Sequence, residues 1–270
     1  MSSTEPPVSR TGRIQAVDRA AGIMRALATG TPTLGVTEIA DRIGLAKPTV
    51  YGLLRTLEHN GLVRQDVDGG KYSLGPAVLQ LGNAYLAGSE LRTRSMLRAA
   101  ALARQVNEAV WVAVLTGAEV MVVHHEFRPD DVVQILEVGA TIPWHACALG
   151  HAIAAHVPEE TLDDLLKAPL RPLTGRTQTS KAALSRALAK VRATGYAVED
   201  QESNVGEGGI AAAILDRHGV GAGSVGIVGP TERLLASTAT TSLARAVVDT
   251  ARAISRDMSG RRHAMALEQG

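Results

Sequence analysis

Cysteine is almost absent from the sequence, in which Cys147 is the only one among 270 residues. A lone cysteine cannot form a disulfide within the chain, which excludes the disulfide-stabilised scaffolds of small secreted proteins. Long apolar runs are also missing, and none approaches the roughly 20 residues that a membrane-spanning helix needs. The first nine residues are polar and contain proline, without the apolar segment of a secretory leader. These absences predict a cytoplasmic protein with no membrane partner.

An excess of charge of one sign is lacking as well, since 28 lysines and arginines face 27 aspartates and glutamates. The charges are unevenly distributed along the chain. Residues 10–75 hold nine basic and six acidic side chains, an excess of three, whereas residues 76–270 hold nineteen and twenty. A modest basic excess at one end is compatible with contact to a polyanion such as nucleic acid.

Three helices are predicted in the N-terminal part of the chain. Apolar residues recur at helical spacing over residues 14–27. Thr37 is expected to cap a second helix, which Gly44 ends. Pro48 suits the first position of a third helix, and Asn60-Gly61 suits its end.

A β-hairpin is predicted directly after the third helix. Extended runs over 62–65 and 71–74 flank residues 66–70, whose glycines tolerate the positive φ of a tight turn. Helix, helix, turn, helix and hairpin are the order of a winged helix-turn-helix. We assign this domain to residues 12–75 and a linker helix to residues 76–90.

The exposed side of the third helix and the hairpin carry the candidate contacts to double-stranded DNA. An α-helix fits the major groove, and the recognition helix of a helix-turn-helix presents its N-terminal residues to base edges. Glycine inside a helix is unfavourable, so Gly52 either permits close approach to DNA or is a tolerated surface residue. A winged helix that serves only protein contacts is the alternative. The predicted DNA-binding residues are Thr37, Lys47, Thr49, Tyr51, Gly52, Arg55, Arg64 and Lys71.

The rest of the chain predicts a second, larger domain of mixed strands and helices over residues 91–260, giving an α+β protein. The expected strands cover 110–115, 119–124, 132–138, 210–215 and 222–228. The expected helices cover 91–106, 148–156, 159–166, 181–194 and 238–258.

Several patterns in this second domain imitate chemical sites. Residues 221–226 spell G-x-G-x-x-G, but a strand continues after them where a dinucleotide site needs a helix. The histidines show no H-E-x-x-H spacing, so a metal site is not predicted. Cys147 near His145 is better explained as a buried apolar residue than as a nucleophile. We therefore predict no catalytic residue, no metal and no cofactor.

Four segments, in order, resemble the IclR family of bacterial transcriptional regulators. The first is Val36 to Leu57, VTEIADRIGLAKPTVYGLLRTL, with Gly61-Leu62-Val63 and Tyr72-Ser73-Leu74-Gly75 after it. The others are PWHACALGHA at 143–152, GYAVEDQE at 195–202 and GIVGP at 226–230. The resemblance implies a GAF-like effector-binding domain and a homodimer or dimer of dimers. It also implies control by a small metabolite, with a repressor favoured over an activator.

The resemblance also places the effector pocket over the sheet of the second domain. Gly209 stands where many members have cysteine, and Gly226 and Val228 stand where many have serine, so the family's effectors do not carry over. A small anionic or polyhydroxylated metabolite is expected, and Glu199 favours a hydroxyl over a bare carboxylate because two close carboxylates repel. The implied effector-binding residues are Ala148, Leu149, Glu199, Gly209, Gly226 and Val228.

Two other classes of protein fit the sequence less well than a ligand-responsive regulator. An enzyme with an appended DNA-binding module would need a paired acid and base or an activated nucleophile, and no such motif is present. A purely architectural DNA binder would be expected to carry basic residues throughout, and residues 76–270 have no basic excess.

Overall fold

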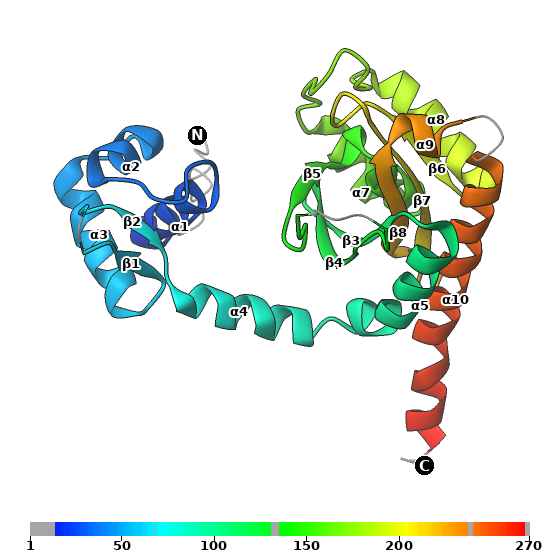
Figure 1. The fold of residues 1–270 in the computed structure, drawn as a ribbon, viewed down its shortest axis with the longest axis horizontal. Helices are drawn as coiled ribbons and strands as arrows, with labels where there is room; N and C mark the ends of the chain where they lie inside the picture. Colours follow the sequence, from blue (N-terminus) through cyan, green and yellow to red (C-terminus); the bar gives the residue numbers. More distant parts are fainter. Residues whose placement is uncertain (1–13, 68, 131–134, 237–239, 268–270) are drawn as a thin grey trace, which may run out of the picture. The chain divides into compact units, whose positions relative to one another are not determined.

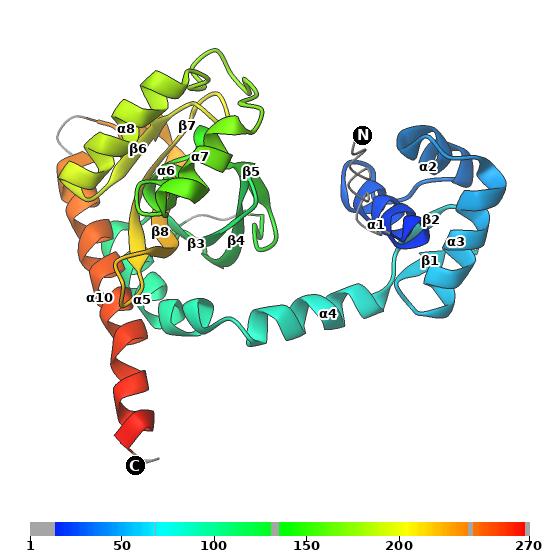
Figure 2. The same ribbon diagram turned by 180° about the vertical axis from the view of Figure 1, so that it is seen from behind.

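The computed structural model describes residues 14–67, 69–130, 135–236 and 240–267 (Figures 1 and 2). The chain divides into two compact units, Met1–Gly88 and Ser89–Gly270. No helix among the described residues is long and apolar enough to cross a lipid bilayer. Helices and strands are both present, and the predicted α+β class is confirmed.

The N-terminal unit is a three-helix domain with a short hairpin. Its core is formed by apolar residues from all three helices, including Ile23, Ile39 and Leu54, with Tyr72 from the hairpin. Leu34 exchanges two backbone hydrogen bonds with Tyr72, at 2.9 and 2.7 Å, and so extends the hairpin by one bridge. The elements are α1 (Gln15–Ala28), α2 (Val36–Ile43), α3 (Lys47–His59), β1 (Val63–Gln65) and β2 (Tyr72–Leu74).

The start of α2 differs from the prediction. Gly35 is the N-cap, so Thr37 lies inside the first turn rather than at the cap. The Glu38 carboxylate accepts a hydrogen bond from the Gly35 backbone N–H at 2.7 Å. This bond satisfies the backbone N–H of the cap residue although glycine has no capping hydroxyl. The other end agrees with the prediction, since Gly44 adopts a φ of 65° that suits glycine.

A linker helix, α4 (Pro76–Ala87), follows the hairpin. It starts where Gly75 packs against the end of α3, and a Cβ on Gly75 would lie 2.2 Å from the Gly61 carbonyl oxygen. The Ala77 N–H also donates to that oxygen, at 3.1 Å. Glycine is therefore required at position 75 to bring the two helices together.

A six-stranded antiparallel sheet organises the C-terminal unit, in the order β5-β4-β3-β8-β7-β6. Helices α5 and α10 cover one face, while α6 and α8 lie on the other (Figures 1 and 2). The strands are β3 (Ala109–Thr116), β4 (Glu119–Glu126), β5 (Thr141–Pro143), β6 (Ala197–Asp200), β7 (Glu207–Leu215) and β8 (Gly221–Pro230). The helices are α5 (Glu90–Val106), α6 (Ala148–Ala154), α7 (Glu159–Lys167), α8 (Lys181–Thr194), α9 (Thr231–Leu234) and α10 (Thr240–Leu267), with a 3-10 turn at Trp144–Ala146.

Four elements of this unit depart from the prediction. The strand expected over 132–138 is wrong where it can be judged, because residues 135–138 are not strand and 131–134 lie outside the described residues. The edge of the sheet is instead β5, paired with β4. Strand β6 and the short helix α9 were not predicted.

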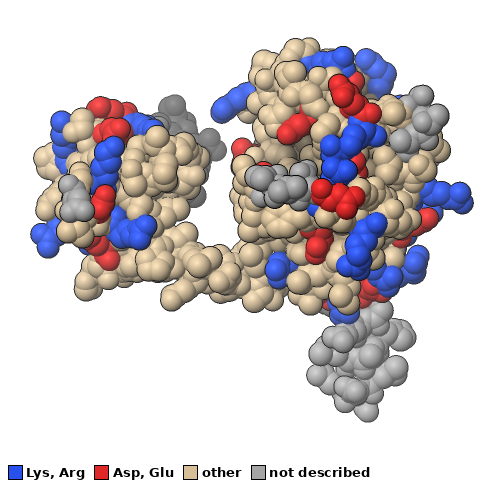
Figure 3. Space-filling model, viewed as in Figure 1, with Lys and Arg blue, Asp and Glu red and all other residues tan. Residues whose placement is uncertain are grey.

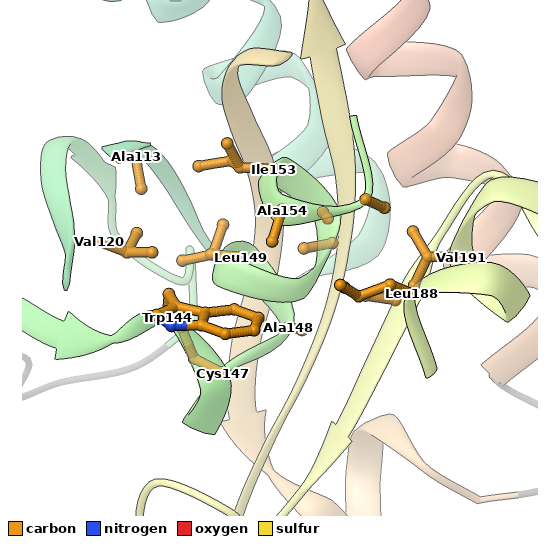
Figure 4. Packing of buried hydrophobic residues seen from close by; sticks show 14 of the residues in the cluster. Ala113, Val120, Trp144, Cys147, Ala148, Leu149, Ile153, Ala154, Leu188 and Val191 are labelled. Carbon is orange, nitrogen blue, oxygen red and sulfur yellow. The ribbon is translucent and has the colours of Figure 1, made fainter. Parts of the chain in front are cut away.

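The core between the sheet and α6 is tightly packed around Trp144, Leu149 and Leu188 (Figure 4). Every residue of α6 is buried. Gly150 faces the 3-10 turn, where a Cβ would lie 2.1 Å from the Trp144 carbonyl oxygen. This close approach fixes α6 over the sheet and so positions Ala148 and Leu149.

Candidate functional site

The exposed side of α3 carries most of the predicted DNA contacts. Val50, Leu54 and Leu57 turn inward, which leaves Lys47, Tyr51 and Arg55 exposed at four-residue spacing along the helix. Thr49 is half-buried in the first turn. Gly52 is exposed, and nothing lies within 4 Å of the position a Cβ would take. The open space means that no packing inside the chain explains a glycine at this position.

The remaining predicted contacts lie on α2 and the hairpin. Thr37 is exposed in the first turn of α2. Lys71 is exposed, and the exposed Arg64 donates from Nε to the Ser73 hydroxyl at 3.0 Å. Figure 3 shows basic and acidic side chains interspersed on the visible face of this unit. This face is thus mixed in charge and presents individual cations rather than one uniform basic patch.

A small cavity lies between α6 and the sheet of the C-terminal unit. Its volume of about 30 Å³ is enough for only about one or two water molecules. Four of the six residues predicted to bind an effector line it, namely Ala148, Leu149, Glu199 and Val228. We call it the inner cavity; its other lining residues are Trp111, Ile142, Cys147, Ser203, Asn204, Glu207, Ala211 and Ile227.

Gly209 and Gly226 do not line the inner cavity. A Cβ on Gly209 would lie 3.4 Å from the Ala148 Cβ and 3.6 Å from Glu199 Oε2, so Gly209 makes room for these two side chains. A Cβ on Gly226 would lie 2.7 Å from the Ala211 Cβ. Both glycines therefore act by leaving space, and neither presents a group to a ligand.

Glu199 is the buried carboxyl group of this cavity. Its Oε1 accepts the backbone N–H groups of Glu202 and Ser203, at 2.5 and 3.2 Å. Burial is the main cause that raises its pKa from 4.5 to about 7, and these hydrogen bonds only partly oppose it. Near neutral pH the group therefore exists in both protonation states, and each state offers a ligand different hydrogen bonding.

Cys147 and the nearby histidines have structural partners. Burial raises the pKa of the Cys147 thiol to about 12, which opposes thiolate chemistry, and its Sγ accepts the Gly150 N–H at 3.3 Å as the cap of α6. His145 and His151 each donate from Nε2 to a backbone carbonyl, at 3.0 and 2.9 Å. Burial lowers the pKa of His151 to about 4. In the described part of the chain, no three metal-binding side chains are grouped so as to hold an ion.

A wider cleft of about 340 Å³ adjoins the inner cavity, and we call it the outer cleft. The two share Trp111, Ile142, Asn204, Glu207 and Val228. The other lining residues are Ala109, His125, Ile135, Glu137, Ala140, Thr141 and Gly229. Together the two spaces form one pocket over the edge of the sheet.

Sequence reasoning missed most of the outer cleft. Trp111 pairs directly with Gly226 across β3 and β8, so it lies on the face that holds the inner cavity. Alternation along the predicted strand 110–115 could have indicated this face. Asn204 and Glu207 follow Glu199 on the segment that leads from β6 to β7, and no sequence pattern marks them. Residues 221–226, which imitate a dinucleotide-binding motif, lie within β8.

Comparison with known proteins gives two matches to family models that together span most of the chain. Residues 83–256 match the bacterial transcriptional regulator IclR C-terminal domain, and residues 16–67 match the IclR helix-turn-helix domain. The glycerol operon regulatory protein of Streptomyces griseus is 43% identical over 250 residues, which cover 92% of this chain and 98% of that protein. The transcriptional repressor IclR of Escherichia coli is 30% identical over 234 residues, 83% of each chain.

A solved structure shares the fold. The IclR transcriptional regulator from Alicyclobacillus acidocaldarius superimposes with a TM-score of 0.79 at 24% identity, over 90% of this chain and 98% of that chain. The curated relatives are named as regulators of transcription, in a family of proteins that are not enzymes.

Proposed function

The chain belongs to the IclR family of bacterial transcriptional regulators, and we propose that it is a repressor whose affinity for its operator is set by a small hydroxylated metabolite. The family joins a helix-turn-helix that binds DNA to a C-terminal domain that binds a ligand. The observation that carries the proposal for this chain is the pocket over the sheet, in which buried polar groups converge on an apolar wall.

The DNA-binding half of the proposal assigns α3 as the recognition helix. Lys47, Tyr51 and Arg55 are exposed along it and suit contacts to phosphates and base edges. Arg64 and Lys71 on the hairpin suit the backbone beside the groove. Thr37, Thr49 and Gly52 complete the proposed surface, where an unobstructed Gly52 lets the helix approach closely.

The effector half rests on the chemistry of the pocket walls. Carboxyl groups of Glu137, Glu199 and Glu207 line the inner cavity and outer cleft, and no lysine or arginine is among the described lining residues. Such walls repel anions and accept hydrogen bonds from hydroxyls. The similar Streptomyces protein is named for the glycerol operon. We therefore assign the effector to neutral polyols of about the size of glycerol or somewhat larger.

The repressor assignment rests on a relative. The Escherichia coli protein that is 30% identical is named as a transcriptional repressor. Binding of an effector to the pocket then has to favour an arrangement of the protein with lower affinity for DNA, because a ligand shifts an equilibrium only by its difference in affinity.

Self-association through α4 is the third part of the proposal. The helix has no buried residue and no charged residue, and the exposed fractions of Leu79, Leu81 and Tyr85 are 68%, 63% and 55%. An uncharged apolar helix surface of this kind is typical of an interface. A second copy of the chain is the occupant that suits an operator with two half-sites, since one recognition helix covers only a few base pairs.

The test is ligand-dependent DNA binding by the full-length protein. Fluorescence anisotropy with a DNA fragment from upstream of its own gene should show binding that glycerol or another small polyol weakens. Val228→Trp should remove the response and keep DNA binding, because Val228 lines both spaces at a half-exposed position where a larger side chain fits. DNA binding that no polyol changes would refute the effector assignment, and absence of DNA binding would refute the whole proposal.

A further inference from the structure

Two hydrogen-bond donors in the wall of the outer cleft are buried without a partner. Trp111 Nε1 and His125 Nε2 make no hydrogen bond with any residue that the structure describes. Buried polar groups in proteins are nearly always satisfied, so each such atom needs an explanation. His125 as a whole is 8% exposed, yet it lines the cleft.

The tautomer of His125 follows from its other ring nitrogen. The Glu137 backbone N–H donates to Nδ1 at 3.2 Å, so Nδ1 carries the lone pair. Burial, followed by the neighbouring His124, lowers the pKa of His125 and keeps the ring neutral. A neutral imidazole with an acceptor at Nδ1 has its hydrogen on Nε2. The unpartnered Nε2 is therefore a donor, like the indole Nε1.

The two donors belong to one cross-strand pair. Trp111 and His125 are directly opposite each other in the register of β3 and β4, on the same face of the sheet. Their ring centroids are 5.8 Å apart, and the rings meet edge to face at 70°. The backbone of both residues is held by strand pairing, and both residues line the outer cleft.

The other unpartnered side chains do not form such a group. Trp144 Nε1, Ser224 Oγ and Arg92 Nε are also buried without a partner among the described residues. None of these three residues lines the inner cavity or the outer cleft. Among the described residues, the combination of two adjacent donors with a neighbouring space is thus particular to Trp111 and His125.

We propose that the indole N–H of Trp111 and the Nε2–H of His125, which have almost no exposed surface in this structure, become exposed to the outer cleft when the effector binds and together bind one of its oxygen atoms. This inference rests on the proposed function and adds the subsite that recognises the ligand. Glu207, whose Oε2 accepts from Asn204 at 2.9 Å, and Glu137 lie in the same cleft and accept the ligand's hydroxyl hydrogens. A molecule with hydroxyl groups and no charge satisfies both the donors and the carboxylates.

The experiment removes each donor and leaves the rest of its side chain in place. Trp111→Phe deletes the indole N–H. His125→Asn deletes the Nε2 donor and keeps an oxygen close to the position of Nδ1 for the Glu137 N–H. Calorimetric titration of the full-length variants with glycerol, and separately with glycerol 3-phosphate, measures the affinity. Trp144→Phe is the matched control, because it deletes an indole N–H that lies outside both spaces.

Each single variant should bind glycerol about tenfold more weakly, as expected for the loss of one hydrogen bond. The affinity of the double variant for glycerol should fall by less than the product of the two single fold-changes, because both donors bind one oxygen atom. Trp144→Phe should retain the affinity of the parent protein. All variants should bind DNA in the absence of glycerol as the parent does.

Three results would overturn the inference. Parental affinity in both single variants, together with loss of binding in Val228→Trp, would show that the ligand binds the pocket without these two donors and would leave the proposed function intact. Tighter binding of glycerol 3-phosphate than of glycerol would contradict a neutral ligand. A parent protein that binds DNA but neither compound would refute the polyol assignment itself.

Discussion

The titration of Glu199 makes stability depend on pH. Because the pKa is raised from 4.5 to about 7, the folded chain binds more protons than the unfolded chain between these values. The free energy of unfolding therefore falls as the pH rises through this window and stays low above it. Each unit of pKa shift corresponds to about 1.4 kcal/mol, so the total is a few kcal/mol.

Glu199→Gln should remove this fall, since glutamine cannot ionise and its oxygen still accepts the N–H groups of Glu202 and Ser203. Urea unfolding should give the variant and the parent similar stabilities near pH 4.5, the ordinary pKa of the group. Well above neutral pH the variant should be the more stable. Burial also raises the pKa of Glu202 to about 7. Because Glu202 remains in both proteins, the free energy of unfolding of the variant should still fall with pH, but less steeply. If the free energies of unfolding of the two proteins differ by the same amount at pH 4.5 and above neutral pH, Glu199 is not desolvated.

Gly150 is a second residue whose surroundings decide the outcome of a substitution. Gly150→Ala places a methyl group where the Trp144 carbonyl oxygen already lies, 2.1 Å away. Overpacking of this kind costs about 1–3 kcal/mol, and more where backbone atoms must move. Thermal unfolding of the C-terminal unit should show the loss. Gly175→Ala, with nothing within 4 Å, is the control and should leave the transition unchanged.

The residues that the resemblance implies for effector binding show which parts of the pocket can be predicted from the sequence. Ala148, Leu149, Glu199 and Val228, which the resemblance implies as effector-binding residues, line the inner cavity. Gly226 does not line the inner cavity. A Cβ at this position would meet the Ala211 Cβ on the neighbouring strand. Trp111 and His125 were not predicted to line the pocket, since only the pairing of β3 with β4 and β8 brings them there.

At the scale of elements, α3 is expected to determine DNA affinity. Arg55→Ala should weaken binding to the operator fragment. A phosphate contact would be lost equally on all sequences and would reduce the slope of log affinity against log salt by about one, whereas a base contact would cost about 1–3 kcal/mol on the operator alone. Lys190→Ala, an exposed cation on α8, is the control. Equal binding by Arg55→Ala and this control would remove Arg55 from the interface.

The elements of the N-terminal unit follow from local sequence. Apolar residues at helical spacing, Gly44 and the residues around Gly70 set α1 to α3 and the hairpin at the predicted positions. The edge of the larger sheet does not follow in this way. Ile135 and Val138 are strand-forming residues, yet Val122 exchanges hydrogen bonds with Gly139 and Ala140, and strand pairing begins only at Thr141. Tertiary pairing overrides local preference there.

At the scale of the whole molecule, the exposed α4 predicts the state of association. Leu81→Glu places a charge on the apolar surface of the helix and should shift the protein from dimer to monomer in sedimentation velocity. Gln80→Glu adds the same charge at the neighbouring exposed position and should leave the dimer largely intact. Equal masses for the two variants would mean that α4 is not the interface.

The small volume of the inner cavity also has a consequence for the speed of response. A space of about 30 Å³ cannot hold a metabolite, so only a ligand that extends from the outer cleft as far as Leu149 requires α6 to move from the sheet. The measured affinity is then the intrinsic affinity multiplied by the fraction of molecules in which α6 has moved. At high concentrations of ligand, the rate of binding reaches a plateau equal to the rate of opening. For such a ligand, the speed of the response is limited by the motion of one buried helix rather than by diffusion of the metabolite.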